Sequence, residues 1–121
     1  MSARVLVEIG LLGGAGAVAR FLVEGAVAAR TAHAFPTGIL VVNVSGALLL
    51  GILTGAGVHG DAYTLVATGL LGSYTTFSTW MVDTHRLAED RRGRAAAANI
   101  AISLALGLAA AWLGRRVGAS L

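Results

Sequence analysis

The stretch GLLGSYTTFSTW, residues 69–80, decides how this 121-residue chain is interpreted. It lies inside an apolar region long enough to cross a bilayer, yet residues 72–79 carry five serine or threonine hydroxyls. Glycine, serine and threonine are poor helix formers, and their hydroxyls compete for backbone hydrogen bonds. The stretch therefore predicts a break in the helix near residues 72–76. Non-helical backbone survives at membrane depth only where protein buries it or where it lines a watery cavity.

The alternative is an unbroken helix whose serine and threonine hydroxyls bond back to carbonyls one turn earlier. A break would leave free carbonyls at the end of the first half-helix, which can hold a cation. It would also leave free N–H groups at the start of the second half-helix, which favour an anion. Phe77 and Trp80 follow the proposed break and share one helical face. The positive edges of their rings can attract an anion, although ordinary aromatic packing uses the same spacing.

The composition indicates that lipid is the solvent of this chain. Hydrophobic residues make up 56% of it and charged residues 12%, and the mean hydropathy is +0.78. A soluble domain of this size has too little interior to bury so much apolar surface. There are nine arginines, no lysines and no cysteines, so disulfides and thiol chemistry are excluded. In a membrane protein such charges face head groups and set topology, so nucleic acid is not expected as a partner.

Four apolar blocks divide the chain, at residues 5–28, 36–58, 62–82 and 95–113. Each is near the ~20 residues that a spanning helix needs. They predict an all-α membrane protein, in which one domain over residues 1–121 has four transmembrane helices and the third is broken near its middle. A cleavable signal peptide is the alternative for the first block, although Arg20 and Glu24 interrupt it.

Glycine pairs recur at a spacing of four residues. Gly10 and Gly14 form one pair, and Gly51 and Gly55 form another. This spacing lets membrane helices approach closely, so we interpret these glycines as packing residues.

Two polar side chains lie well inside the blocks. Placing Arg20 in mid-helix costs on the order of 2.5–3.5 kcal/mol, which Glu24 one turn later could partly offset. Arg20 is therefore either half of a local pair near the membrane edge or a cation beside a watery vestibule. Asn43 must find partners for its amide in lipid. It is either a link between helices or part of a functional path.

Three ordered motifs resemble the Fluc fluoride channels, also called the CrcB family. They are GGAGAVARF (residues 13–21), FPTGILVVNVSG (35–46) and GLLGSYTTFST (69–79). The resemblance implies small four-span subunits, paired antiparallel in a dimer within a prokaryotic inner (plasma) membrane. Such channels pass fluoride passively, reject chloride and lower cytoplasmic fluoride by efflux.

The resemblance also implies residue roles. A sodium ion at the dimer centre, which is not transported, would be held by the backbone carbonyls of Gly72 and Thr75. Arg20 corresponds to the vestibule arginine. The residues expected along the fluoride path are Asn43, Phe77, Trp80 and Ser103.

Several positions depart from the family pattern. Trp80 replaces the second pore phenylalanine, Ile39 a threonine and Asp83 a glutamate. The polar track of the fourth span matches Asn99, Ser103 and Gly107, so a tyrosine and a serine are missing. The sodium site is expected to be intact, whereas one or both pore linings are altered.

Arginine placement bears on the partner. With four spans, three arginines share the side of the termini, and five share the other side (Arg30, Arg86, Arg91, Arg92 and Arg94). The positive-inside rule then favours both termini outside. Opposed copies of one chain should carry nearly balanced charge. We therefore hypothesise a related, oppositely oriented subunit as partner, with a dimer of the chain with itself as the alternative.

Two rival functions stay open. A proton-coupled exporter of the small multidrug-resistance type has the same size and span number, but needs a lone acidic residue deep in its first span. Glu8 is shallow and Glu24 has Arg20 nearby. A non-conducting structural subunit of a heterodimeric fluoride channel is the second rival. An enzyme is not expected, because no nucleophile–base pair or metal set stands out.

Overall fold

The computed structural model describes residues 1–32 and 34–121, which are helical and contain no strand. Position 33, in the connector after the first block, lies outside the described residues. Three helices are long and apolar enough to cross a membrane, namely α1 (Ala3–Ala28), α2 (Thr37–Gly55) and α6 (Gly93–Ala119). Between α2 and α6 come α3 (Gly60–Tyr63), the π-helix η1 (Thr64–Leu71), α4 (Gly72–Tyr74) and α5 (Ser78–Glu89). The all-helical architecture is confirmed.

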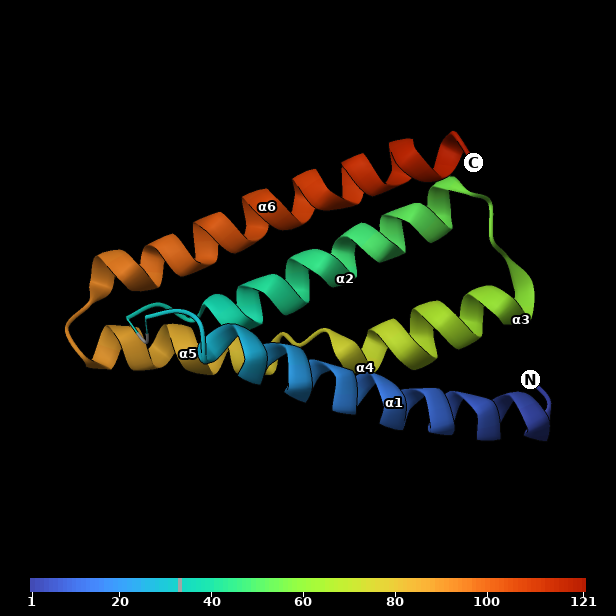
Figure 1. Ribbon diagram of the computed structural model, residues 1–121, viewed down its shortest axis with the longest axis horizontal. Coiled ribbons are helices and arrows are strands. Elements are labelled where there is room, and N and C mark those ends of the chain that lie inside the picture. The colour runs from blue at the N-terminus through green and yellow to red at the C-terminus, as the bar shows by residue number, and fades with distance from the viewer. Residues whose placement is uncertain (33) are drawn as a thin grey trace.

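The long elements run up and down alongside one another, and both chain ends lie at the same end of the molecule (Figure 1). Helices α2 and α6 pack side by side along most of their length. Helix α1 lies against η1 and α4, and α5 packs on the first part of α6. Helix α1 also contacts α2 directly, so the α3–α5 region is flanked by α1 and by the α2–α6 pair without separating them.

Glycines form the seam between α2 and α6. A Cβ atom added at Gly51 or Gly55 would collide with the backbone of α6, and one added at Gly114 or Gly118 would collide with the backbone of α2. The packing role predicted for Gly51 and Gly55 is confirmed. The same interpretation fails within this chain for Gly10 and Gly14, because nothing lies within 4 Å of a Cβ placed there. Their face of α1 is turned away from the other helices.

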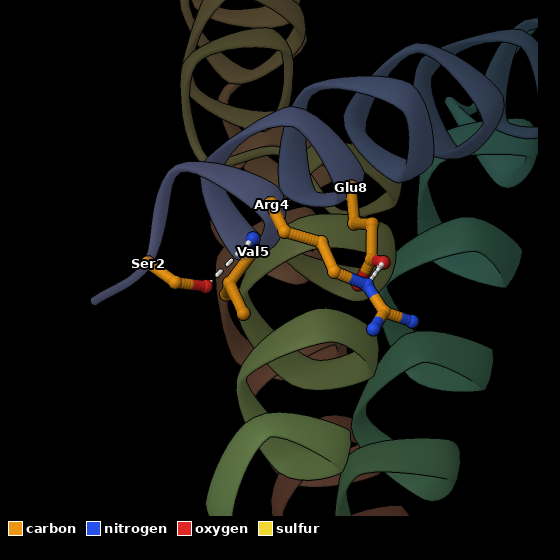
Figure 2. A network of polar contacts seen from close by, with 4 residues as sticks. All are labelled: Ser2, Arg4, Val5 and Glu8. Carbon is orange, nitrogen blue, oxygen red and sulfur yellow. Dashed lines mark hydrogen bonds and ion pairs between the residues drawn. The ribbon is translucent and has the colours of Figure 1, made fainter.

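Helix α1 begins with a capped and paired turn (Figure 2). The Ser2 hydroxyl accepts the Val5 N–H at 3.3 Å, and Arg4 Nε donates to Glu8 Oε1 at 2.7 Å. An exposed pair of this kind adds little stability. Its consequence is electrostatic, since the carboxylate of Glu8 already has a cationic partner.

The large apolar side chains point outward. Leu11, Phe21 and Leu108 are each more than 70% exposed. The buried apolar residues are few: Val5, Ile39, Val42, Leu71, Leu87 and Ala96. An exterior that exposes so many large apolar side chains suits a bilayer and not water.

Candidate ion pathway

The backbone leaves the helical conformation between α4 and α5, where Figure 1 shows the ribbon uncoil. Helix α4 ends at Tyr74, Thr75 is extended with φ −79° and ψ 158°, and α5 begins only at Ser78. The predicted interruption covered residues 72–76, whereas the non-helical residues are 75–77. The helical turn persists through Ser73, whose hydroxyl donates to carbonyls in the preceding turn at 2.8 and 3.0 Å.

Asn43 of α2 supplies the hydrogen bonds that the helix no longer makes. Its Nδ2 donates to the carbonyl of Thr76 at 2.9 Å, and its Oδ1 accepts the N–H of Thr76 at 2.8 Å. One side chain therefore satisfies both backbone groups of a residue 33 positions away. An unpaired backbone group buried away from water costs about 1–3 kcal/mol, so this pairing stabilises the non-helical segment.

The same segment leaves carbonyl oxygens free. The N–H of Thr76 is used by Asn43, and the N–H of Thr79 donates to the Thr76 hydroxyl at 3.2 Å. Over residues 1–32 and 34–121, no hydrogen-bond donor reaches the carbonyl oxygens of Gly72 and Thr75. Unwound backbone carbonyls are the ligands that membrane proteins use for sodium. The chemistry of these two oxygens therefore fits the sodium site expected at them.

A groove of 440 Å³ opens beside the non-helical segment, lined by residues from α2, η1, α4, α5 and α6. Its lining is mostly apolar. It brings together six of the seven predicted site residues: Asn43, Gly72, Thr75, Phe77, Trp80 and Ser103. The seventh, Arg20 on α1, is not among the residues that line it. The predicted path residues therefore meet in this groove.

Two aromatic rings line this groove. The rings of Phe77 and Trp80 lie 5.6 Å apart at 84° to each other, an edge-to-face arrangement. Phe77 is 70% exposed, whereas the indole Nε1 of Trp80 donates to the carbonyl of Asn99 at 3.2 Å. The Trp80 N–H is therefore committed to α6, and the pair offers aromatic surface to the groove.

Asn99 does not take the place that its position in the polar track predicted. It is 1% exposed, does not line the groove, and donates through Nδ2 to the Thr84 hydroxyl at 2.9 Å. That hydroxyl in turn donates to the carbonyl of Trp80 at 2.8 Å. Asn99 therefore joins α5 to α6, because a buried amide must be paired and Thr84 is within reach. Sequence reasoning missed Thr84, for which a hydroxyl one turn after Trp80 was the only signal.

Ser103 and Gly107, the next two track positions, do line the groove. The Ser103 hydroxyl is buried and has no hydrogen-bond partner within the described part of the chain. An unpaired buried hydroxyl is unfavourable unless something absent from a single chain pairs with it. Ser103 thus brings an unpaired, buried hydroxyl to the wall of the groove.

Residues 7–115 match the family described as CrcB-like protein, Camphor Resistance (CrcB). The chain belongs to the CrcB family. Across 113 residues, 93% of either chain, it is 53% identical to the "Fluoride-specific ion channel FluC 2" of Mycolicibacterium paratuberculosis.

Two CrcB-family relatives come from a single organism, Symbiobacterium thermophilum. The one named "Fluoride-specific ion channel FluC 1" is 46% identical over 118 residues, covering 93% of this chain and 95% of the relative. The one named "Fluoride-specific ion channel FluC 2" is 46% identical over 110 residues, covering 87% and 89%. These relatives are named as ion channels and not as enzymes. Together with its three apolar helices, CrcB membership identifies the chain as a multi-pass membrane protein.

Two of the positions expected to depart from the family pattern lie outside the groove. Ile39 is buried, and together with Asp83 it lines a separate cavity of 290 Å³ near the connector between α1 and α2. Glu24 lines this second cavity as well. Ile39 and Asp83 therefore do not line the groove, whereas Trp80 and Gly107 do.

Proposed function

We propose that this chain is a subunit of a fluoride-specific ion channel that lowers cytoplasmic fluoride by passive efflux across a prokaryotic inner membrane. The observation that carries the proposal is the meeting of Asn43, Phe77, Trp80 and Ser103 in one groove. Fluoride is small and strongly hydrated, so a path must replace its water with donors and positive edges while binding weakly enough to release it. The printed names of the CrcB relatives support the same function.

We propose that η1, α4 and α5 together form the third membrane crossing, in two pieces joined by residues 75–77. No single helix of this region is long and apolar enough to span a bilayer. The pairing of Asn43 with Thr76 supports the proposal, because it satisfies backbone that lipid could not. The polar segment then faces the groove and not hydrocarbon.

The proposed sodium ion belongs at the free carbonyls of Gly72 and Thr75. When bound, it would supply a fixed positive charge close to the groove and would not itself be transported. The chain's own contribution is to keep these oxygens clear of competing donors. The hydroxyl and the N–H of Thr75, for example, both donate to the carbonyl of Leu71 at 3.0 Å.

A second subunit completes the path in this proposal. The groove is not enclosed within one chain, and Phe77, which lines it, is 70% exposed. We propose that an oppositely oriented subunit covers it, either a second copy or a related chain. The excess of arginine at the end opposite the termini favours the related chain. The two named relatives in one organism support such a pairing.

The rival functions are less well supported. A proton-coupled exporter requires a lone acidic residue deep in the first span, whereas Glu8 is paired with Arg4 near the start of α1. Glu24 lies at the other end and lines the second cavity. A non-conducting subunit makes no use of the unpaired Ser103 hydroxyl beside the groove.

The experiment that separates these functions is anion release from liposomes without a proton gradient. A channel releases fluoride down its own gradient when a protonophore has collapsed the proton gradient. An exporter would lose activity under that condition. A structural subunit would release no fluoride in either condition.

A further inference from the structure

We infer that Asn43 is a positioning residue for the cation site, and that it sets the direction of the Thr75 carbonyl by holding the N–H of Thr76. The inference rests on the proposed function, since it concerns the proposed sodium site. It assigns Asn43 a role beyond contact with the anion. The argument depends on which atoms share a peptide group.

The carbonyl of Thr75 and the N–H of Thr76 belong to the same peptide unit. That unit is planar, and no described peptide bond is cis, so its C=O and N–H point in opposite directions. Asn43 Oδ1 accepts the Thr76 N–H at 2.8 Å. The Thr75 carbonyl is therefore directed away from Asn43, and it cannot turn without breaking that hydrogen bond.

The second hydrogen bond of Asn43 holds the next peptide unit. Nδ2 donates to the Thr76 carbonyl at 2.9 Å, so the units on both sides of the Thr76 Cα are fixed by one amide. Gly46, on the same face of α2, lets this segment approach, because a Cβ there would collide with the Thr75 side chain. Asn43 and Gly46 together seat residues 75 and 76 against α2.

The amide thereby connects two functions. Nδ2 carries two hydrogens, of which Thr76 takes one, and Asn43 lines the groove. Among the described residues the other hydrogen has no acceptor, and it can serve an anion. The side chain that offers a donor to the path also orients a ligand of the cation, so replacing it should weaken sodium binding as well as fluoride passage.

The test is a sodium titration of thermal stability, which needs no transport measurement. The purified full chain is melted in detergent at increasing sodium concentration, with N-methylglucamine keeping the ionic strength constant. A bound ion raises the melting temperature in a concentration-dependent way. We expect Asn43→Leu to raise the half-maximal sodium concentration by about ten-fold or more, because the peptide is no longer held.

Ser45→Ala is the matched control. The Ser45 hydroxyl also connects α2 to α4, through a 2.9 Å contact with the Tyr74 hydroxyl, but it does not touch the peptide between residues 75 and 76. This variant should keep the half-maximal sodium concentration of the unchanged chain. If Asn43→Leu does not fold, Asn43→Asp takes its place. It keeps an acceptor for the Thr76 N–H, so its half-maximal concentration should not rise.

The outcomes separate the two proposals. No sodium dependence in the unchanged chain would overturn the sodium site itself, and the positioning role with it. Sodium dependence in the unchanged chain, with the same midpoint in Asn43→Leu, would leave the site standing and overturn the positioning role. A raised midpoint in Asn43→Asp would overturn that role as well.

Discussion

The indole N–H of Trp80 donates to the backbone carbonyl of Asn99 at 3.2 Å, and this bond fastens α5 to α6 beside the groove. It also explains how a tryptophan can stand in an aromatic pair at this site. The only polar atom of the ring is occupied by α6, so Trp80 meets Phe77 as an aromatic surface, at 84° and 5.6 Å. The ring is positioned by its nitrogen and presents its carbon framework to Phe77.

Trp80→Phe separates the anchoring of this ring from its aromatic surface. The variant loses the bond to Asn99, so its free energy of unfolding should fall by about 0.5–1.5 kcal/mol. Its preference for fluoride over chloride should persist, because an aromatic ring still faces Phe77. Melting in detergent and anion release from liposomes measure the two effects. A matched Trp80→Leu variant should lose fluoride release, and unimpaired release from it would count against a role for the ring.

Ser103→Ala tests whether the unpaired hydroxyl serves the anion. The hydroxyl makes no hydrogen bond within the described residues, so its removal should leave the melting temperature unchanged or slightly raised. Fluoride release should nevertheless fall. Ser120→Ala is the control, because Ser120 bonds only the Val117 carbonyl near the end of the chain and should release fluoride normally. Normal release from Ser103→Ala would remove this residue from the path.

Gly51→Ala probes the seam between α2 and α6. The added methyl group would press on backbone atoms near Ala111, which cannot move aside as a side chain can. Overpacking of this kind costs about 1–3 kcal/mol. Gly10→Ala is the control, since nothing lies within 4 Å of the new methyl group and alanine favours a helix. Equal melting temperatures for the two variants would contradict the packing described here.

Asn43→Asp places a like charge on the anion path. The carboxylate lines the groove at the position of the amide, so fluoride release from liposomes should fall strongly. The variant should still fold, because one oxygen can accept the Thr76 N–H. Release equal to that of the unchanged chain would show that Asn43 does not line the path.

Hydropathy predicted the three long apolar helices, because lipid imposes a simple rule on length and polarity. Block 5–28 corresponds to Ala3–Ala28, and block 36–58 to Thr37–Gly55. The fourth block, 95–113, falls short of the helix Gly93–Ala119, which continues through Arg115 and Arg116. Hydropathy detects only the part of a helix that can lie in lipid. Backbone hydrogen bonding lets the helix continue beyond that part, into polar residues.

In the third block, helix propensity predicted that the helix is interrupted but not exactly where. Weak helix formers indicated an interruption near residues 72–76, but the hydroxyl of Ser73 supports one more turn and the chain uncoils at Thr75. The π-helix Thr64–Leu71 had no signal in the sequence. That these pieces form a single broken crossing stays a prediction.

The roles of the two asparagines could not be separated from sequence. Both were candidates for a polar path, and a buried amide serves equally well as a link between helices. Only the packing brings Asn43 to Thr76, 33 residues away, and Asn99 to Thr84. Asn43 faces the groove while holding the backbone, whereas Asn99 is enclosed between α5 and α6.

The most direct test of the central claim is fluoride release, compared with chloride release, from liposomes that contain this chain, either alone or with an oppositely oriented relative from the same cell. With the proton gradient collapsed by a protonophore, the account predicts fluoride release well above that of protein-free liposomes and chloride release no greater than theirs. Fluoride release by the chain alone would show that copies of this chain form a working channel without a related subunit. The account is contradicted if neither preparation releases fluoride faster than bare liposomes, or if chloride leaves as readily as fluoride.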